Sequence, residues 1–178
     1  HIVKNFNEKI VSEVRKDEQR RLIAEGDVEA AHSLKKTHYI LMSSRKTLQR
    51  KDKDAAEERV ITKGSSIFGT EDYIRKSGHE ECYDELLSQN KLLFTLDLIK
   101  ERLTLAYSRK DEARMAEDII DIMDTCEAAK NEHLMWFKRL LDNHFEGIIA
   151  HATYDISAGK IEGINNKIKT LRRQAYGY

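Results

Sequence analysis

Apolar residues recur every three or four positions along most of the chain, which is the spacing of amphipathic helices. The first such segment covers residues 1–25, and we expect it to end near Gly26, because glycine readily takes the left-handed conformation of a helix C-terminal cap. A second segment starts at Asp27, a residue type that caps helix N-termini, and runs towards Leu48. The apolar positions of these two segments are Ile2, Val3, Phe6, Ile10, Val14, Ala31, Leu34 and Leu41.

Three more helices are predicted downstream. One extends from about Glu81 to Tyr107, the next has its N-terminus at Ser108 with Asp111, and the last opens at Asn131. Residues 63–78 contain three glycines and three serines, so we expect a loop or irregular excursion there. With the C-terminal segment, the pattern predicts an all-α array of about five or six helices without a sizeable sheet. Trp136 and Phe137 lie in an apolar stripe and are expected in the core, although an exposed aromatic ring could stack on nucleic-acid bases.

Composition agrees with a helix-rich protein. Hydrophobic residues make up 40% of the chain and charged residues 35%, and proline, the commonest helix breaker, is absent. No apolar run approaches the roughly 20 residues that span a membrane, so we expect a cytoplasmic protein. Cys82 and Cys126 are far apart in sequence and are expected to stay thiols. The seven histidines show no spacing that would indicate a nucleophilic triad or a zinc site.

The C-terminal segment, ISAGKIEGINNKIKTLRRQAYGY from Ile156 onward, departs from this balance. The whole chain has 31 basic and 31 acidic residues, whereas residues 160–173 carry five cations and a single carboxylate, Glu162. On a helix, Glu162 shares one face with amide and cationic side chains, and the opposite face is apolar. The polar face consists of Glu162, Asn166, Lys169 and Arg173, and the apolar face of Ile161, Ile164, Ile168, Leu171 and Ala175. We therefore expect Glu162 to be exposed or to face a cleft, and Ile164, Ile168 and Leu171 to be buried.

Spacing alone leaves two interpretations of Glu162 open. It can pair with lysines one or two turns away on an ordinary exposed helix. Alternatively, it can hold a divalent metal beside a polyanion, because Mg²⁺ takes oxygen ligands from carboxylates and from phosphates.

The spacing S-x-G-x-x-E-G-x-N-N-x-I-K-x-x-x-R-x-A-Y-G-Y closely resembles the end of the catalytic domain in ISL-type bacterial insertion-sequence transposases of the DDE class. The opening HIVKNFNEKIVSEVRKDE is similar to the segment that follows the second catalytic Asp of that family. The stretches THYILMSSRKTLQRKD and YDELLSQNKLLFTLDLIKERL resemble its helical insertion. The resemblance is strong at both ends of the chain and loose over residues 55–81.

This resemblance implies an incomplete piece of an RNase H-like transposase domain. It divides the chain into an N-terminal helix (1–25), the helical insertion (26–145) and the C-terminal segment with the DDE Glu helix (146–178). Glu162 would be the third metal-binding carboxylate, the second Asp would precede His1, and the metal would be Mg²⁺ or Mn²⁺ in the intact protein. The implied DNA-binding residues are Asn165, Asn166, Lys167, Lys169, Arg172 and Arg173. With both aspartates missing, we expect this chain to be inactive alone and to bind no metal.

Two further expectations concern partners. The run Arg45, Lys46, Arg50, Lys51 and Lys53 is a second candidate contact for DNA, with a plain solvent-facing helix as the alternative. Apolar helix faces that would pack on the missing sheet favour a homodimer. The competing interpretation of the whole chain is a helical interaction module without catalysis.

Overall fold

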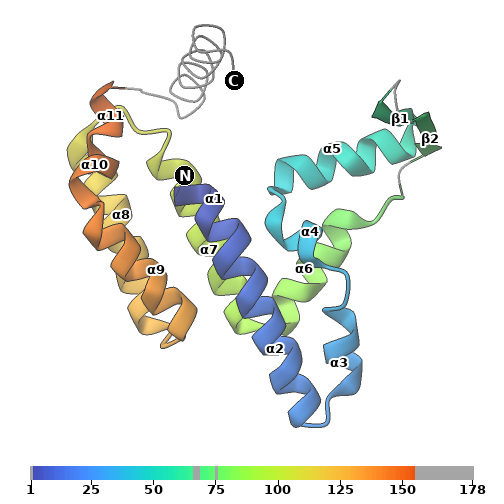
Figure 1. Cartoon of the computed structure of the whole chain (residues 1–178), viewed down its shortest axis with the longest axis horizontal. Coiled ribbons are helices and arrows are strands. Elements are labelled where there is room, and N and C mark those ends of the chain that lie inside the picture. The colour runs from blue at the N-terminus through green and yellow to red at the C-terminus, as the bar shows by residue number, and fades with distance from the viewer. Residues whose placement is uncertain (1, 66–68, 75, 155–178) are drawn as a thin grey trace, which may run out of the picture. The chain divides into compact units, whose positions relative to one another are not determined.

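In the computed structural model (Figure 1), residues 2–65, 69–74 and 76–154 are described. This part of the chain is helical apart from one two-stranded sheet, which confirms the all-α class. It forms two compact units, an N-terminal unit of residues 5–98 and a C-terminal unit built mainly from residues 99–154. Within these described ranges, no helix has the length and apolar character needed to cross a membrane.

The described chain opens with a continuous helical stretch, which belongs to the N-terminal unit from residue 5 onward. It comprises α1 (Ile2–Asn5), a π-helical segment η1 (Phe6–Val11) and α2 (Ser12–Ala24). Gly26 follows with φ of 83°, and the Asp27 carboxylate accepts a hydrogen bond of 3.0 Å from the Ala30 N–H. The predicted helix end at Gly26 and the predicted N-cap at Asp27 are both confirmed.

The prediction of one continuous helix from Asp27 towards Leu48 is wrong. The segment forms three short helices, which are α3 (Val28–Ser33), α4 (His38–Met42) and α5 (Arg45–Ala56). Lys36 has a left-handed φ of 66°, which interrupts the first pair. Ser43 is extended, and Ser44 caps α5 by accepting from the Thr47 N–H at 3.2 Å. The helix count therefore exceeds five or six.

The predicted helix from Glu81 to Tyr107 is likewise two helices, α6 (His79–Gln89) and α7 (Lys91–Ala106). Asn90 between them is extended, and its side-chain oxygen accepts from the Leu93 N–H at 3.0 Å. The same side chain donates to Glu18 in α2 at 2.7 Å. This contact, made 72 residues away in sequence, explains why apolar periodicity alone did not reveal the break.

The segment expected to be irregular contains an antiparallel hairpin. Strand β1 (Val60–Ser65) pairs with β2 (Gly69–Ile74) in a register that sets Val60 opposite Ile74 and Ser65 opposite Gly69. The hydroxyl of Thr62 donates to the Asp72 carboxylate across the strands at 2.6 Å. The β-branched run Val60, Ile61 and Thr62, followed by glycines, was a sequence signal for this hairpin.

Apolar residues from η1 and from helices α2 to α7 form the core of the N-terminal unit. Its members include Phe6, Ile10, Val11, Val14, Ala31, Leu34, Leu41, Leu48, Tyr83, Leu86, Leu93 and Leu96. Two carboxylates are buried with them, those of Asp97 and Glu18, which are 5% and 8% exposed. The Glu18 carboxylate accepts hydrogen bonds from Arg21 and Asn90. Hydrogen bonds from both partners offset the cost of removing this carboxylate from water.

The C-terminal unit contains α8 (Glu112–Ala128), α9 (Glu132–Asn143), α10 (Phe145–Ile149) and α11 (His151–Tyr154), together with the end of α7. The N-cap of α8 is Asp111, whose carboxylate accepts a hydrogen bond of 2.9 Å from the Arg114 N–H. Ser108 does not cap this helix, and its hydroxyl donates to the Leu105 carbonyl. Asn131 caps α9 as predicted. The core residues of this unit, with those of α7 first, are Ile99, Leu103, Ala106, Met115, Ile119, Ile122, Cys126, Leu134, Phe137, Leu141, Ile148 and Ala152.

Trp136 is not a core residue, contrary to the sequence-based expectation, because 39% of its surface is exposed. Phe137, its neighbour in α9, is fully buried as expected. At about 100° per residue, Trp136 lies on the side of α9 opposite the buried Leu134 and Leu141. The register of the helix therefore separates two aromatic residues that follow one another in sequence.

Candidate nucleic-acid interface

The predicted metal and DNA-binding residues of the C-terminal segment lie outside the described residues. They are Glu162, Asn165, Asn166, Lys167, Lys169, Arg172 and Arg173. Their assigned roles, and the expected burial of Ile164, Ile168 and Leu171, stay predictions.

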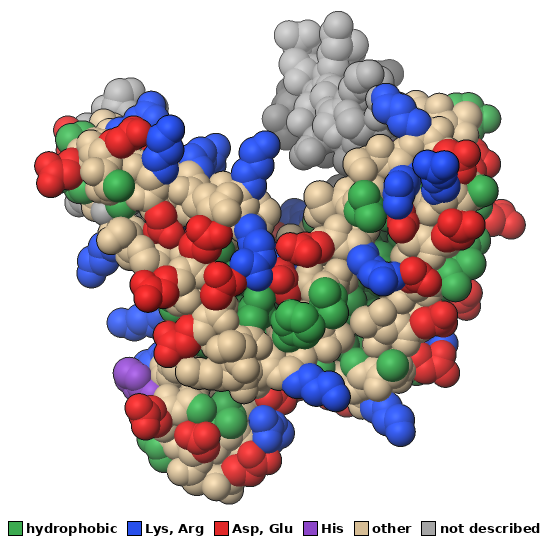
Figure 2. Space-filling view, turned by 180° about the vertical axis from the view of Figure 1, so that it is seen from behind, with side chains coloured by type: hydrophobic (Ala, Val, Ile, Leu, Met, Phe, Trp, Pro, Cys, Tyr) green, Lys and Arg blue, Asp and Glu red, His purple; other side chains and the backbone are tan. Residues whose placement is uncertain are grey.

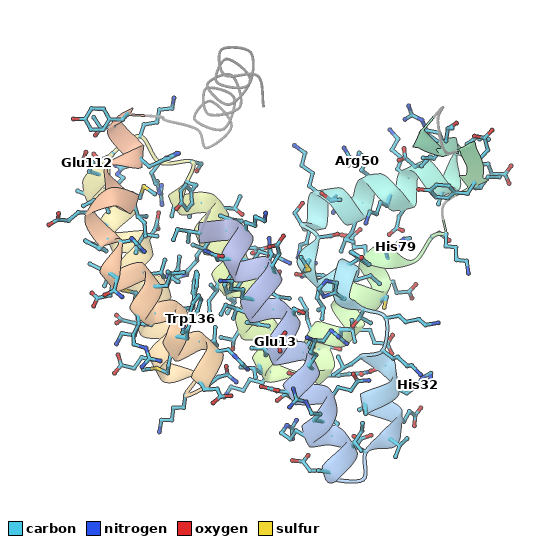
Figure 3. The ribbon with its side chains drawn as sticks, viewed as in Figure 1. Glu13, His32, Arg50, His79, Glu112 and Trp136 are labelled. Carbon is cyan, nitrogen blue, oxygen red and sulfur yellow. The ribbon has the colours of Figure 1, made fainter. Side chains whose placement is uncertain are left out.

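The second predicted DNA contact falls on α5, where the structure sorts its cations into two groups. Lys46, Arg50 and Lys53 are exposed and lie within about 60° of one another on the helix, opposite the fully buried Leu48. We call these three residues the cationic face. Lys and Arg side chains line the α5 part of the surface in Figure 2, and Figure 3 shows Arg50 on this helix.

The charges of the cationic face are largely uncompensated. Within the described chain, Lys46 and Arg50 have no ion-pair partner, and the Nζ atom of Lys53 lies 3.8 Å from Glu57. An exposed pair at that distance contributes little binding energy and is easily exchanged for another anion. The three residues extend along about 10 Å of helix axis, which is the axial length of about three nucleotides of one DNA strand.

Arg45, by contrast, holds the helix in place. Its guanidinium bonds to Asp84 at 2.6 Å, lies 3.4 Å from Asp97 and covers the ring of Tyr83 at 5.2 Å. The hydrogen bond to Asp84 raises the pKa of Arg45 above its usual value, although partial burial opposes the charge. Arg45 therefore does not belong to the candidate DNA contact, contrary to the sequence-based expectation.

The C-terminal half of α5 is fixed against the start of α6. Gly78 occupies the N-cap position of α6 with φ of 85° and has no side chain to offer. Asp52 of α5 supplies the missing cap of α6. Its carboxylate accepts hydrogen bonds from the backbone N–H groups of His79 at 3.0 Å and Glu80 at 2.8 Å. Nδ1 of His79 lies 2.9 Å from the same carboxylate.

This cluster changes the acidity of Asp52. Burial opposes ionisation, but the hydrogen bonds from Glu80 and His79 outweigh it and hold the pKa of Asp52 below its usual value. Asp52 is therefore ionised at neutral pH and satisfied within the fold. The negative charge of Asp52 is thus engaged with α6.

The hairpin brings further residues to α5 that sequence reasoning missed. A pocket of about 550 Å³ is lined by Lys51, Tyr73, Ile74, Lys76 and His79. These residues come from α5, from β2 and from the start of α6, and Figure 3 shows where His79 lies. Because residues 63–78 were expected to be irregular, nothing in the pattern indicated that Tyr73 and Lys76 would meet Lys51.

Comparison with known proteins places this chain in a family. The family model described as "Transposase", for the ISL3 group of DDE transposases, matches residues 1–178. The chain is also 26% identical over 180 residues to the transposase for insertion sequence element IS1001 of Bordetella parapertussis, a match that covers 100% of this chain. The chain spans 37% of the length of that relative. No solved structure matches the chain. The chain belongs to the ISL3 family of DDE transposases.

Proposed function

We propose that this chain is part of the catalytic region of a transposase that cuts and joins DNA, and that the cationic face of α5 contacts the DNA backbone. The proposed DNA contact rests on one observation. Lys46, Arg50 and Lys53 are exposed on the side of α5 opposite the buried Leu48. Cations that face solvent without strong partners release counterions when they meet phosphates, which favours binding to any DNA sequence. The helix is held rigidly by Arg45 and Asp52, so these cations approach DNA as a preformed row.

In the same proposal the C-terminal segment supplies the chemistry. The Glu162 carboxylate is a hard oxygen donor of the kind that Mg²⁺ or Mn²⁺ binds, so it fits a ligand of such a metal. When bound, the metal would activate the attacking oxygen and stabilise the leaving oxygen in phosphoryl transfer. Lys167, Lys169, Arg172 and Arg173 would hold the phosphates of the DNA end against Glu162.

We also propose that the RNase H-like sheet and the two aspartates of the metal site come from the rest of the transposase. One carboxylate of three cannot build a two-metal site. The isolated chain is therefore expected to bind DNA weakly and without sequence preference, and not to cleave it.

Fluorescence anisotropy with a labelled blunt duplex tests the DNA contact. The triple variant Lys46→Gln, Arg50→Gln and Lys53→Gln removes the cationic face. A matched control, Lys35→Gln, Lys91→Gln and Lys110→Gln, removes the same charge from exposed lysines elsewhere. Titrations at several salt concentrations separate phosphate binding by α5 from a general effect of net charge.

We expect the α5 triple variant to weaken duplex binding and to lower the salt dependence by about 1 for each cation that binds a phosphate in the wild type. The control should change both quantities much less. Equal effects of the two variants would show that only net charge matters and would overturn the assignment of α5. A wild-type chain that binds no duplex at low salt would favour a helical interaction module instead.

A further inference from the structure

The pocket beside α5 combines two cations with an aromatic wall. Lys51 comes from α5, Tyr73 and Ile74 from the end of β2, Lys76 from the connection to α6, and His79 from the first turn of α6. The rings and aliphatic atoms of this wall are accessible, since Tyr73 is 42% and Ile74 53% exposed. The volume of about 550 Å³ lies within the usual range of sites for small organic groups.

The polar groups of the pocket are arranged to receive an anion. Neither Lys51 nor Lys76 has an ion-pair partner within the described residues. The carboxylate of Asp52, beside His79, already has three contacts with His79 and Glu80.

A second opening at the α5 and α6 junction has the opposite character. It is lined by Asp52, Glu80, Glu81, Asp84 and Glu85, with Gly78 and Ser88. A polyanion is repelled there and attracted to the pocket that holds the two lysines. The charge distribution around the junction therefore selects one of the two openings for a phosphate.

We propose that the pocket lined by Lys51, Tyr73, Lys76 and His79 binds an unpaired nucleotide of DNA. The phosphate would lie between the two lysines, and the base would stack on the ring of Tyr73. This inference rests on the proposed DNA binding of the chain. A paired base is unsuited to the site because its faces are already covered by its neighbours in the duplex, whereas an unpaired base offers a free face to an aromatic side chain.

The experiment measures binding of a labelled single strand and of a blunt duplex of equal length by anisotropy. Tyr73→Ala removes the stacking surface, Tyr73→Phe keeps it, and Lys51→Gln with Lys76→Gln removes the cations. Tyr39→Ala is the control for an exposed tyrosine, since Tyr39 is 76% exposed on α4 and does not line the pocket. Lys35→Gln with Lys91→Gln is the control for charge.

We expect Tyr73→Ala to weaken single-strand binding by about 5- to 150-fold, with little effect on the duplex. Tyr73→Phe and Tyr39→Ala should bind as the wild type does. The double lysine variant should lower the single-strand salt dependence by about 1.4 more than its control. If Tyr73→Ala weakens binding no more than Tyr39→Ala, or affects both DNA forms equally, the inference fails.

Two comparisons separate this inference from others. Loss of duplex binding in the α5 triple variant, with unchanged single-strand binding in Tyr73→Ala, would support the proposed function and overturn the pocket. The reverse pattern would support the pocket and overturn the role of the cationic face. A free deoxynucleoside monophosphate should compete only at millimolar concentration, and displacement at micromolar concentration would show that the site takes small nucleotides and not DNA.

Discussion

The hydroxyl of Tyr83 in α6 donates a hydrogen bond to the carboxylate of Asp97 in α7, and the two side chains are 1% and 5% exposed. The second oxygen of Asp97 lies 3.4 Å from the guanidinium of Arg45 in α5. Three helices therefore meet at one buried carboxylate. A buried charge is costly unless it is hydrogen-bonded, so Asp97 favours the position of α5 in which Arg45 reaches it. This position determines the direction in which the cations of α5 point.

The first prediction concerns this contact. Tyr83→Phe should lower the free energy of unfolding by about 1.5–3 kcal/mol, because it removes a hydrogen bond to a charged, buried group and keeps the ring volume. Urea denaturation followed by circular dichroism measures the change. Tyr39→Phe is the control, since Tyr39 is 76% exposed, and it should leave the midpoint in place. Equal midpoints for all three proteins would contradict the role of Tyr83.

A second prediction concerns Asp52 and pH. Asp52→Ala should lower the free energy of unfolding by about 1 kcal/mol at neutral pH, because α6 loses the acceptor at its N-terminus. The pKa of Asp52 is lower in the folded than in the unfolded chain, so its stabilisation is full above the unfolded value of about 3.9. It is lost as pH falls through the folded pKa.

This direction of the pH dependence is tested by measuring the unfolding free energies of the wild type and Asp52→Ala from neutral to acidic pH. The difference in unfolding free energy between the two proteins should stay constant down to about pH 5 and disappear below about pH 4. A gap that opens towards acid would mean that the pKa of Asp52 is raised in the folded chain.

Helix ends that depend on local chemistry were predictable from the sequence. Gly26, Asp27 and Asn131 act through their own backbone or through N–H groups two or three residues away. The break at Asn90 was not predictable, because its side chain is held by Glu18 from a distant part of the chain. Propensity cannot report a contact that exists only after folding.

The candidate interface shows the same limit. Arg45 and Lys46 are adjacent and equally basic in sequence, yet the acidic partners of Arg45 lie 39 and 52 residues further along. Only the fold separates the cation that holds α5 from the cation that faces solvent. The hairpin likewise decides which residues reach Lys51, so Tyr73 and Lys76 could be assigned to the pocket only from the structure.

A third prediction concerns the two thiols. Burial raises the pKa of Cys126 to about 12, and it also raises the pKa of Cys82, which is only half-buried. Because the thiolate is the reactive form, Cys126 should resist alkylation by iodoacetamide at neutral pH until the chain unfolds, while Cys82 should react slowly. Mass spectrometry of each cysteine after timed labelling gives the rates. Fast labelling of Cys126 in the folded chain would show that α8 opens readily.

The last prediction concerns the chemistry of a transposase that contains this chain. Glu162→Gln should abolish strand cleavage and leave DNA binding nearly unchanged, because Gln keeps the shape of the side chain but loses the charge that holds a divalent metal. Lys169→Gln should instead weaken DNA binding and lower its salt dependence by about 1, as expected when one cation no longer meets a phosphate. Cleavage assays with Mg²⁺ or Mn²⁺ and binding titrations on the same variants separate the two roles. Cleavage that survives Glu162→Gln would remove Glu162 from the metal site, and cleavage by the isolated chain that is lost on Glu162→Gln would show that this chain is active alone.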